Sequence, residues 1–387
     1  MPRNKTLSSV LKKIESATGL ANEHYISKKQ HQIEKCSVMF KNWSGLAFGK
    51  DIPNVGDIKP IHFLGLPLLI VRTNENVINV FENTCRHRGM TLVDKKQSAK
   101  KNIRCPYHNW CYALDGALTS TPHVGGVGVH EHKDINPSSL GLNQIRSYVW
   151  KDIIFINVSG TAKSFTQNFS QLITRWQDFE QTIVYGKANS SFSLSVKANW
   201  KLIIENYCES YHLPNIHPIL NKTSKLEDHY DICDSAIYSG QGSYNYRQLS
   251  DNEDAVLTDF KNLSVKWYQG SEYIAIYPNV LMGVHRDNIF CIILEPLSVT
   301  ETKERVALYY SKLLKPSNQI NALKTKNMKF WKKIFEEDIF VVEGMQKGRY
   351  GNMFNGGKFS PIMDRPTHNF HGWVATQIDQ ANTGEKE

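Results

Sequence analysis

The sequence predicts an α+β protein of two domains: a small all-β domain, then a larger domain that combines helices with an antiparallel sheet. The prediction rests on a change of pattern along the 387 residues. Short apolar segments alternate with turn residues up to Val158, and helix-like segments join them after Ser159. We expect a helical arm at 1–37 that packs on the larger domain, the all-β domain at 38–158 and the larger domain at 159–387.

The all-β domain is expected to consist of short strands joined by tight turns. Leu68–Val71 and Val77–Phe81 are apolar and strand-like. Trp110–Leu118 is typical of a strand pair around an Asp-Gly turn. We interpret Val149–Val158 as a single, strongly apolar strand that ends the domain.

The larger domain alternates between the two kinds of segment. Helix-like segments lie near 165–182, 198–212 and 318–348, and strand-like segments lie around 235–247, 272–284 and 289–312.

Cysteine and histidine are the unusual part of the composition, with seven Cys and 14 His. Met1–Lys13 is polar and basic and lacks the apolar core of a secretory signal. No stretch approaches the roughly 18 apolar residues that a membrane span needs. We therefore expect a reduced, cytoplasmic protein without a membrane segment, in which Cys and His clusters indicate a metal before a disulfide.

The net charge of +9 is a weaker clue. We expect no nucleic-acid partner, because no recognised binding motif accompanies the charge. The densest basic cluster is either a solvated loop or a docking face for an acidic protein, and it comprises Lys95, Lys96, Lys100, Lys101 and Arg104.

Two short segments of the all-β domain each offer one thiolate and one imidazole. Cys85 and His87 form the first pair, and Cys105 and His108 form the second. Two Cys and two His can hold zinc, or a Rieske [2Fe–2S] cluster in which the two His bind one of the irons. A zinc finger usually presents Cys–Cys and then His–His, so the mixed order within each pair favours the cluster.

A second group of polar residues lies in the larger domain. On a helix through 199–212, Glu209 and His212 share the face opposite an aromatic stripe. Pro214 should end that helix near His212 and push Leu213 out of helical angles. His217 then follows from the next turn.

A third ligand would complete an iron site. Asp338 lies within the apolar stripe of the helix expected at Trp331–Met345, while Glu336, Glu337 and Glu343 are expected to point elsewhere. A buried carboxylate needs a charge partner, and two His with one carboxylate form the facial triad of non-haem iron(II) enzymes. The alternative is a solvated polar face with a local ion pair.

Both groups lie in segments that resemble Rieske non-haem iron oxygenases. Asn83–Gly89, Cys105–His108 and Trp110 are similar to the Rieske domain of ring-hydroxylating oxygenases. Five further segments resemble the catalytic-domain signature of the α subunits of these oxygenases: Asn199–Lys201, Glu205–Tyr207, Tyr211–His212, His217–Pro218 and Glu337–Asp338. The resemblance covers about residues 24 to 350.

The resemblance implies a role for each of these residues. Cys85, His87, Cys105 and His108 would bind the [2Fe–2S] cluster, and His212, His217 and Asp338 the mononuclear iron(II). Glu209 would be the bridging carboxylate that links this iron to the cluster of a neighbouring subunit.

The resemblance also implies the reaction and the partners. The chain would be the terminal oxygenase of a system in which a reductase or ferredoxin supplies electrons, with NAD(P)H involved only indirectly. It would use O2 to hydroxylate, and in some cases demethylate, a small organic substrate. A homotrimer and a helix-grip catalytic domain are implied as well. A Rieske electron-transfer protein without oxygenase activity is the alternative.

The resemblance leaves two substrate classes, quaternary amines and aromatic acids. A bridging Glu, here Glu209, is typical of relatives that resemble carnitine monooxygenases. Leu213 stands where choline- and carnitine-type relatives often carry Cys, which counts against an amine. Six aromatic residues are either core packing or, for some of them, a cation–π box for a quaternary ammonium: Tyr244, Tyr246, Trp267, Tyr268, Tyr273 and Tyr277.

Overall fold

The computed structural model describes residues 5–98, 101–187, 189–250 and 255–383, and it divides into two compact units. The smaller unit is Lys41–Ala162. The larger unit combines Met1–Phe40 with Lys163–Glu387, so the N-terminal arm groups with the C-terminal part of the chain. Lys100 of the basic cluster lies outside the described residues.

The smaller unit is all β. A seven-stranded antiparallel sheet has the order β1-β10-β9-β4-β3-β2-β5, and β6, β7 and β8 form a second, three-stranded sheet. Its strands are β1 (Ser44–Phe48), β2 (Asp57–Phe63), β3 (Leu66–Asn74), β4 (Val77–Glu82), β5 (Gln97–Ser98), β6 (Asn102–Arg104), β7 (Cys111–Ala113), β8 (Leu118–Ser120), β9 (Gln144–Trp150) and β10 (Ile153–Asn157).

The expectation of a single strand at Val149–Val158 is wrong. The segment contains the end of β9, a two-residue turn and β10, with Trp150 opposite Ile153. The turn residues Lys151 and Asp152 have φ values of 50° and 64°. A two-residue turn with both φ values positive matches the twist of paired strands, so the apolar run folds back on itself.

The larger unit is built on an eight-stranded antiparallel sheet of order β11-β18-β17-β16-β15-β14-β13, with β12 also paired to β18. Apolar side chains of the central strands fill its core. The strands are β11 (Ile183–Tyr185), β12 (Ser191–Val196), β13 (His229–Ile232), β14 (Tyr238–Ser243), β15 (Ser271–Ile276), β16 (Val280–Val284), β17 (Asn288–Ser298) and β18 (Glu301–Ser311).

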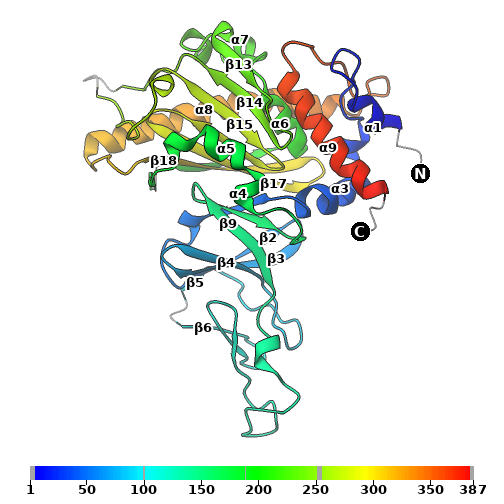
Figure 1. Cartoon of the computed structure of the whole chain (residues 1–387), viewed down its shortest axis with the longest axis vertical. Helices are drawn as coiled ribbons and strands as arrows, with labels where there is room; N and C mark the ends of the chain where they lie inside the picture. Colours follow the sequence, from blue (N-terminus) through cyan, green and yellow to red (C-terminus); the bar gives the residue numbers. More distant parts are fainter. Residues whose placement is uncertain (1–4, 99–100, 188, 251–254, 384–387) are drawn as a thin grey trace. The chain divides into compact units, whose positions relative to one another are not determined.

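Helix α6 packs on β14, β15 and β17 and also contacts α8 and α9 (Figure 1). The described α-helices of this unit are α1 (Lys5–Val10), α2 (Glu23–Ile26), α3 (Lys28–Glu34), α4 (Phe165–Asn168), α5 (Ser170–Arg175), α6 (Trp200–Cys208), α7 (Leu213–Ile216), α8 (Asn318–Gly348) and α9 (Arg365–Thr383). A π-helical turn (Lys35–Phe40) and four short 3-10 helices (Gln177–Phe179, Leu220–Lys222, Leu226–Asp228 and Val265–Tyr268) join them. None of the helices that the structure describes is both long enough and apolar enough to cross a membrane.

The N-terminal arm is tied to α6 by a buried ion pair. The ammonium of Lys201 lies 2.5 Å from the Glu34 carboxylate, and both side chains are almost fully buried. The Tyr25 hydroxyl donates to Glu205 of the same helix at 2.5 Å. Because a buried charge is costly without its partner, the arm and α6 depend on each other.

Candidate metal centres

Two loops of the smaller unit repeat one backbone pattern, and each begins at a cysteine. The amides of Cys85 and Cys105 donate to the carbonyl five residues later, at 2.8 and 2.9 Å. Their carbonyls accept from the amides of Gly89 and Asn109, at 3.0 and 3.1 Å. Those two residues have φ values of 71° and 61°, a region that Gly and Asn tolerate best. The repeat presents each Cys–His pair in the same way.

The loops bring like side chains together. The Nδ1 atoms of His87 and His108 lie 3.1 Å apart, and His87 stacks on Trp110 at 4.8 Å. The thiols of Cys85 and Cys105 are buried and interact with each other. Two nitrogens at about 2.1 Å from one metal ion would be separated by a distance of this order. The side chains therefore fit a cluster with imidazole and thiolate ligands on different irons.

The protonation of these groups depends on their surroundings. Burial raises the pKa of the Cys85 thiol, although the Tyr112 hydroxyl, 3.2 Å from its sulfur, opposes the shift. Partial burial and then the charges of His108 and Arg88 lower the pKa of His87. The lowered pKa favours the neutral imidazole that metals bind.

In the larger unit, α6 ends earlier than expected. It begins at Trp200, where the Asn199 side chain accepts from the amide of Lys201, and it ends at Cys208 instead of continuing to His212. Glu209 is extended, with φ −118° and ψ 162°. Its carbonyl accepts from the side-chain amide of Gln241 on β14, at 3.1 Å. This tertiary hydrogen bond replaces one that a longer helix would have made.

The segment after Glu209 turns instead of extending. Leu213 is helical, contrary to expectation, and Pro214 lies in the first turn of α7. A proline is tolerated there because its missing N–H would have had no partner within the helix. His217 follows the end of α7 with φ −119° and ψ 59°, outside the helical region as expected for a residue before proline. His212 and His217 thus flank one short helix.

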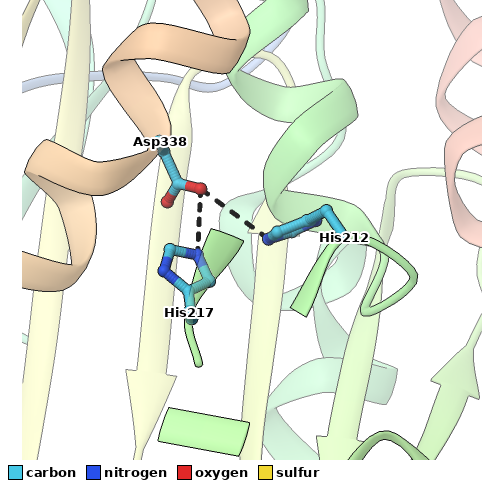
Figure 2. Close-up of side chains that lie close together, drawn as sticks. All are labelled: His212, His217 and Asp338. Atoms are coloured by element: carbon cyan, nitrogen blue, oxygen red, sulfur yellow. Dashed lines mark ion pairs between the residues drawn. The ribbon is translucent and has the colours of Figure 1, made fainter. Parts of the chain in front are cut away.

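This turn brings both histidines to Asp338 of α8 (Figure 2). Asp338 Oδ1 lies 3.0 Å from His217 Nε2 and 3.7 Å from His212 Nε2. One ligand atom from each residue can be chosen so that all lie within 4.8 Å of one another. The structure therefore brings together the three residues that the sequence suggests as iron ligands.

The donor set fits a metal ion. Asp338 Oδ1 is buried, and among the described residues the two imidazoles are the only partners that the structure gives it. Two imidazole nitrogens and a carboxylate oxygen are the ligands of a 2-His-1-carboxylate iron site. A cation between them would compensate the buried charge of Asp338.

Each of the two histidines is oriented by a second carboxylate. His212 Nδ1 lies 2.7 Å from Glu209 Oε1, and His217 Nδ1 lies 2.9 Å from Glu337 Oε2. Burial lowers the pKa of His217, but the hydrogen bonds and charges of Asp338 and Glu337 outweigh it and the pKa is raised. Such carboxylates fix the tautomer and ring orientation of a metal-binding histidine.

The expectation that Glu337 points elsewhere is therefore wrong. The helical period places Glu337 beside the apolar stripe of α8, and not on it. The structure adds the turn around α7, which brings His217 to that flank of α8. Glu336 does point away, since it is exposed and pairs with Lys332 at 3.4 Å.

Glu304 of β18 is a further residue that the sequence reasoning missed. Burial raises the pKa of Glu304 to about 8, and the charge of Asp338 adds to the shift. A small cavity of ≈ 20 Å³ is lined by both residues. Strand alternation could have identified Glu304 as buried. Every second residue of a strand lies on the same face, and Glu304 shares the buried face of β18 with Thr302 and Val306.

A cavity of ≈ 60 Å³, here called the inner chamber, adjoins the three candidate ligands. Apart from these, its walls are mainly apolar and include Leu213, Tyr273, Phe290, Trp331 and Phe335. Of the aromatic residues between Tyr244 and Tyr277, Tyr273 lines this chamber, whereas Trp267 and Tyr277 are buried in the core.

Two family models match the chain. The Rieske [2Fe-2S] domain matches residues 42–132, and the ring hydroxylating alpha subunit (catalytic domain) matches residues 185–380. The match to the Rieske domain favours a [2Fe–2S] cluster over zinc. The match to the catalytic domain does not favour the alternative, a Rieske electron-transfer protein without oxygenase activity.

Characterised relatives are similar along most of the chain. The carnitine monooxygenase oxygenase subunit of Acinetobacter pittii is 24% identical, with 90% of each chain covered. The glycine betaine monooxygenase oxygenase subunit of Pseudomonas aeruginosa is 23% identical, covering 100% of this chain and 94% of the relative.

Solved structures share the fold. The quaternary ammonium Rieske monooxygenase CntA in complex with L-carnitine has a TM-score of 0.73 at 20% identity, over 93% of this chain and 96% of the other. Naphthalene 1,2-dioxygenase from Rhodococcus sp. has a TM-score of 0.74 at 15% identity, over 99% and 98%. The chain belongs to the family of ring-hydroxylating α subunits, and it is a Rieske-type terminal oxygenase whose domains imply a [2Fe–2S] cluster, a mononuclear iron and electrons from a reductase.

Proposed function

We propose that this chain hydroxylates a methyl group of a small quaternary amine, with His212, His217 and Asp338 as the iron ligands. The observation that carries the proposal is the three-residue cluster at the wall of an aromatic chamber. The two relatives named above, a carnitine and a glycine betaine monooxygenase subunit, support the substrate class. A methyl hydroxylated next to nitrogen collapses to a demethylated amine and formaldehyde.

The surrounding side chains prepare this site. Glu209 and Glu337 hold the two imidazoles so that both Nε2 atoms face Asp338. The apolar walls of the inner chamber exclude water and hold the reacting end of the substrate close to the ligands. When bound, the iron supplies the centre for O2 activation and the [2Fe–2S] cluster supplies single electrons.

We assign the cluster to Cys85, His87, Cys105 and His108, on the basis of their paired loops. Glu209 is proposed as the carboxylate that links the iron site to the cluster of a neighbouring subunit in a homotrimer. A head-to-tail contact between identical subunits closes into a ring. Sedimentation of the intact protein tests this assembly, and a monomer that is active alone would contradict it.

The electron donor is proposed to be a reductase that oxidises NAD(P)H, or a ferredoxin that such a reductase reduces. The basic residues near Lys95 suit an acidic donor. We propose the cytoplasm as the location, because none of the seven cysteines, all of which lie in the described part of the chain, forms a disulfide. Cross-linking to a candidate donor at low and high salt tests the electrostatic contact. A contact that does not change with salt would contradict it.

A substrate panel tests the proposed reaction. The iron-loaded enzyme, with a reductase, is incubated with glycine betaine, L-carnitine and choline, and in parallel with aromatic acids. Formaldehyde formed in step with O2 consumption is the expected result. A cis-diol from an aromatic acid would replace the proposal with ring dioxygenation, the reaction class of the naphthalene dioxygenase that shares the fold.

A further inference from the structure

A second, larger cavity adjoins the inner chamber. This outer chamber has a volume of ≈ 360 Å³, against ≈ 60 Å³ for the inner one. The two share four wall residues, so they lie next to each other; these are Leu220, Ser224, Tyr273 and Trp331. A volume of this size falls in the range of small-molecule sites, whereas the inner chamber has room for only one end of a substrate.

The charged residues that line the outer chamber are all positive among those that the structure describes. Arg247 and Lys326 line it, and no carboxylate does so among the residues that the structure describes. Lys326 donates to the carbonyl of Ser250 at 2.6 Å. Gln248, which also lines the chamber, donates to Asp259 at 3.0 Å and to Asp287 at 3.2 Å, and Arg286 pairs with Asp259. The chamber therefore favours an anionic group.

An unused hydrogen-bond donor lies in the wall that both chambers share. Trp331 is 2% exposed, and its Nε1 has no hydrogen-bond partner within the described part of the chain. The indole N–H is a donor only, and buried indoles usually find an acceptor. A bound molecule with an oxygen acceptor at this point would satisfy it.

We propose that the outer chamber binds a carboxylate at the end of the substrate opposite the reacting methyl group. Arg247 is the principal cation, Lys326 adds to the positive field, and the Trp331 N–H donates to a substrate oxygen. The inference rests on the proposed function for the reacting end of the substrate. It narrows the substrate to molecules that carry a carboxylate, and it gives the residues that recognise it.

Binding to the intact, iron-loaded enzyme without O2 tests the inference, measured by calorimetry. Matched pairs differ only at the end group: glycine betaine against choline, and benzoate against benzyl alcohol. In at least one pair, the carboxylate is expected to bind about tenfold tighter than the alcohol, as one charge-assisted hydrogen bond can provide. Equal affinities within both pairs, or no binding of either carboxylate, overturn the inference.

Three variants identify the residues. Arg247→Gln should remove most of the preference for the carboxylate and leave the alcohol unaffected. Trp331→Phe keeps an aromatic ring and removes the N–H, so it should weaken carboxylate binding by a smaller factor. Lys329→Gln is the control, because Lys329 is an exposed cation of the same helix outside the chamber walls. A preference that persists in Arg247→Gln overturns the assignment.

Turnover separates this inference from the proposed function. If the carboxylate preference is present but the enzyme with its reductase forms no product from any amine, the proposed reaction is wrong and the anion site stands. If amines are demethylated with the same KM whether or not they carry a carboxylate, the reaction stands and the anion site is wrong.

Discussion

The two candidate metal centres are held in different ways. In the smaller unit, each Cys–His pair lies in a single loop, and hydrogen bonds within that loop fix its shape. In the larger unit, His212 and His217 flank a short helix, while Asp338 comes from α8, much later in the chain. There the imidazoles are oriented by carboxylates, not by the backbone.

The difference shows where each site is vulnerable. The loops around Cys85 and Cys105 depend on local backbone angles, so a change far away in the sequence should matter little. The site around Asp338 depends on the packing of α6, α7 and α8, and each of its ligands needs a neighbour to orient it.

Removal of Asp338 should separate the two centres. Asp338→Ala is expected to abolish turnover and mononuclear iron, because two neutral imidazoles alone do not hold the ion as the triad does. The visible absorbance of the [2Fe–2S] cluster should remain. Iron analysis should fall from about three to about two atoms per chain. Retained activity would contradict the assignment of this ligand.

The reciprocal change should remove the other centre. Cys85→Ser is expected to lose the cluster and its colour while the larger unit still binds one iron, since a hydroxyl replaces the thiolate ligand. Cys111→Ser is the matched control: Cys111 is also buried in this unit, but its thiol donates to the carbonyl of Asn109 at 3.1 Å. Equal loss of colour in both variants would refute the ligand role of Cys85.

Glu337 should affect the iron site by a graded amount. Glu337→Leu removes the acceptor at His217 Nδ1, and iron affinity or activity should fall about 10- to 100-fold. Competition with a chelator measures the affinity. Glu336→Gln, an exposed neighbour on the same helix, should behave like the unchanged protein. If Glu337→Leu keeps the affinity of the unchanged protein, the carboxylate does not orient His217.

The smallest effect is expected in the loop backbone. Gly89→Ala places a Cβ where only Thr84 Cγ2 lies nearby, at 4.0 Å, so the cost comes from the φ of 71° and not from a clash. Unfolding free energy should fall by about 1 kcal/mol. Urea unfolding followed by cluster absorbance measures it, and the iron content should not change. A loss of several kcal/mol, or of the cluster, would mean that the loop cannot relax.

Local features of the chain were predictable from the sequence. The Asp-Gly hairpin lies between β7 and β8, and α8 has the bounds that its apolar periodicity indicates, 318–348. The spacing of Cys85, His87, Cys105 and His108 pointed to paired loops. These features depend on turn propensity, helical period and short-range hydrogen bonds, all of which are encoded within a few residues.

The errors about the end of α6 and about Glu337 have a common origin in contacts between distant segments. The sequence could not show that Gln241 would bind the carbonyl of Glu209 and thereby end α6 at Cys208. Nor could it show that His217 would meet Glu337. Helical periodicity assigns a residue to a face, but it does not say which other segment approaches that face.

The sequence alone predicted the two kinds of domain, the order of the candidate ligand residues and the helix that carries Asp338. Three features depend on the tertiary structure instead. They are the carboxylates that contact the two histidines, the burial of Glu304, and the chamber beside Trp331 that is lined by Arg247 and Lys326. The physical reason is that ligand identity is a property of residues and their spacing, whereas orientation, burial and charge balance are set by neighbours that are remote in the chain.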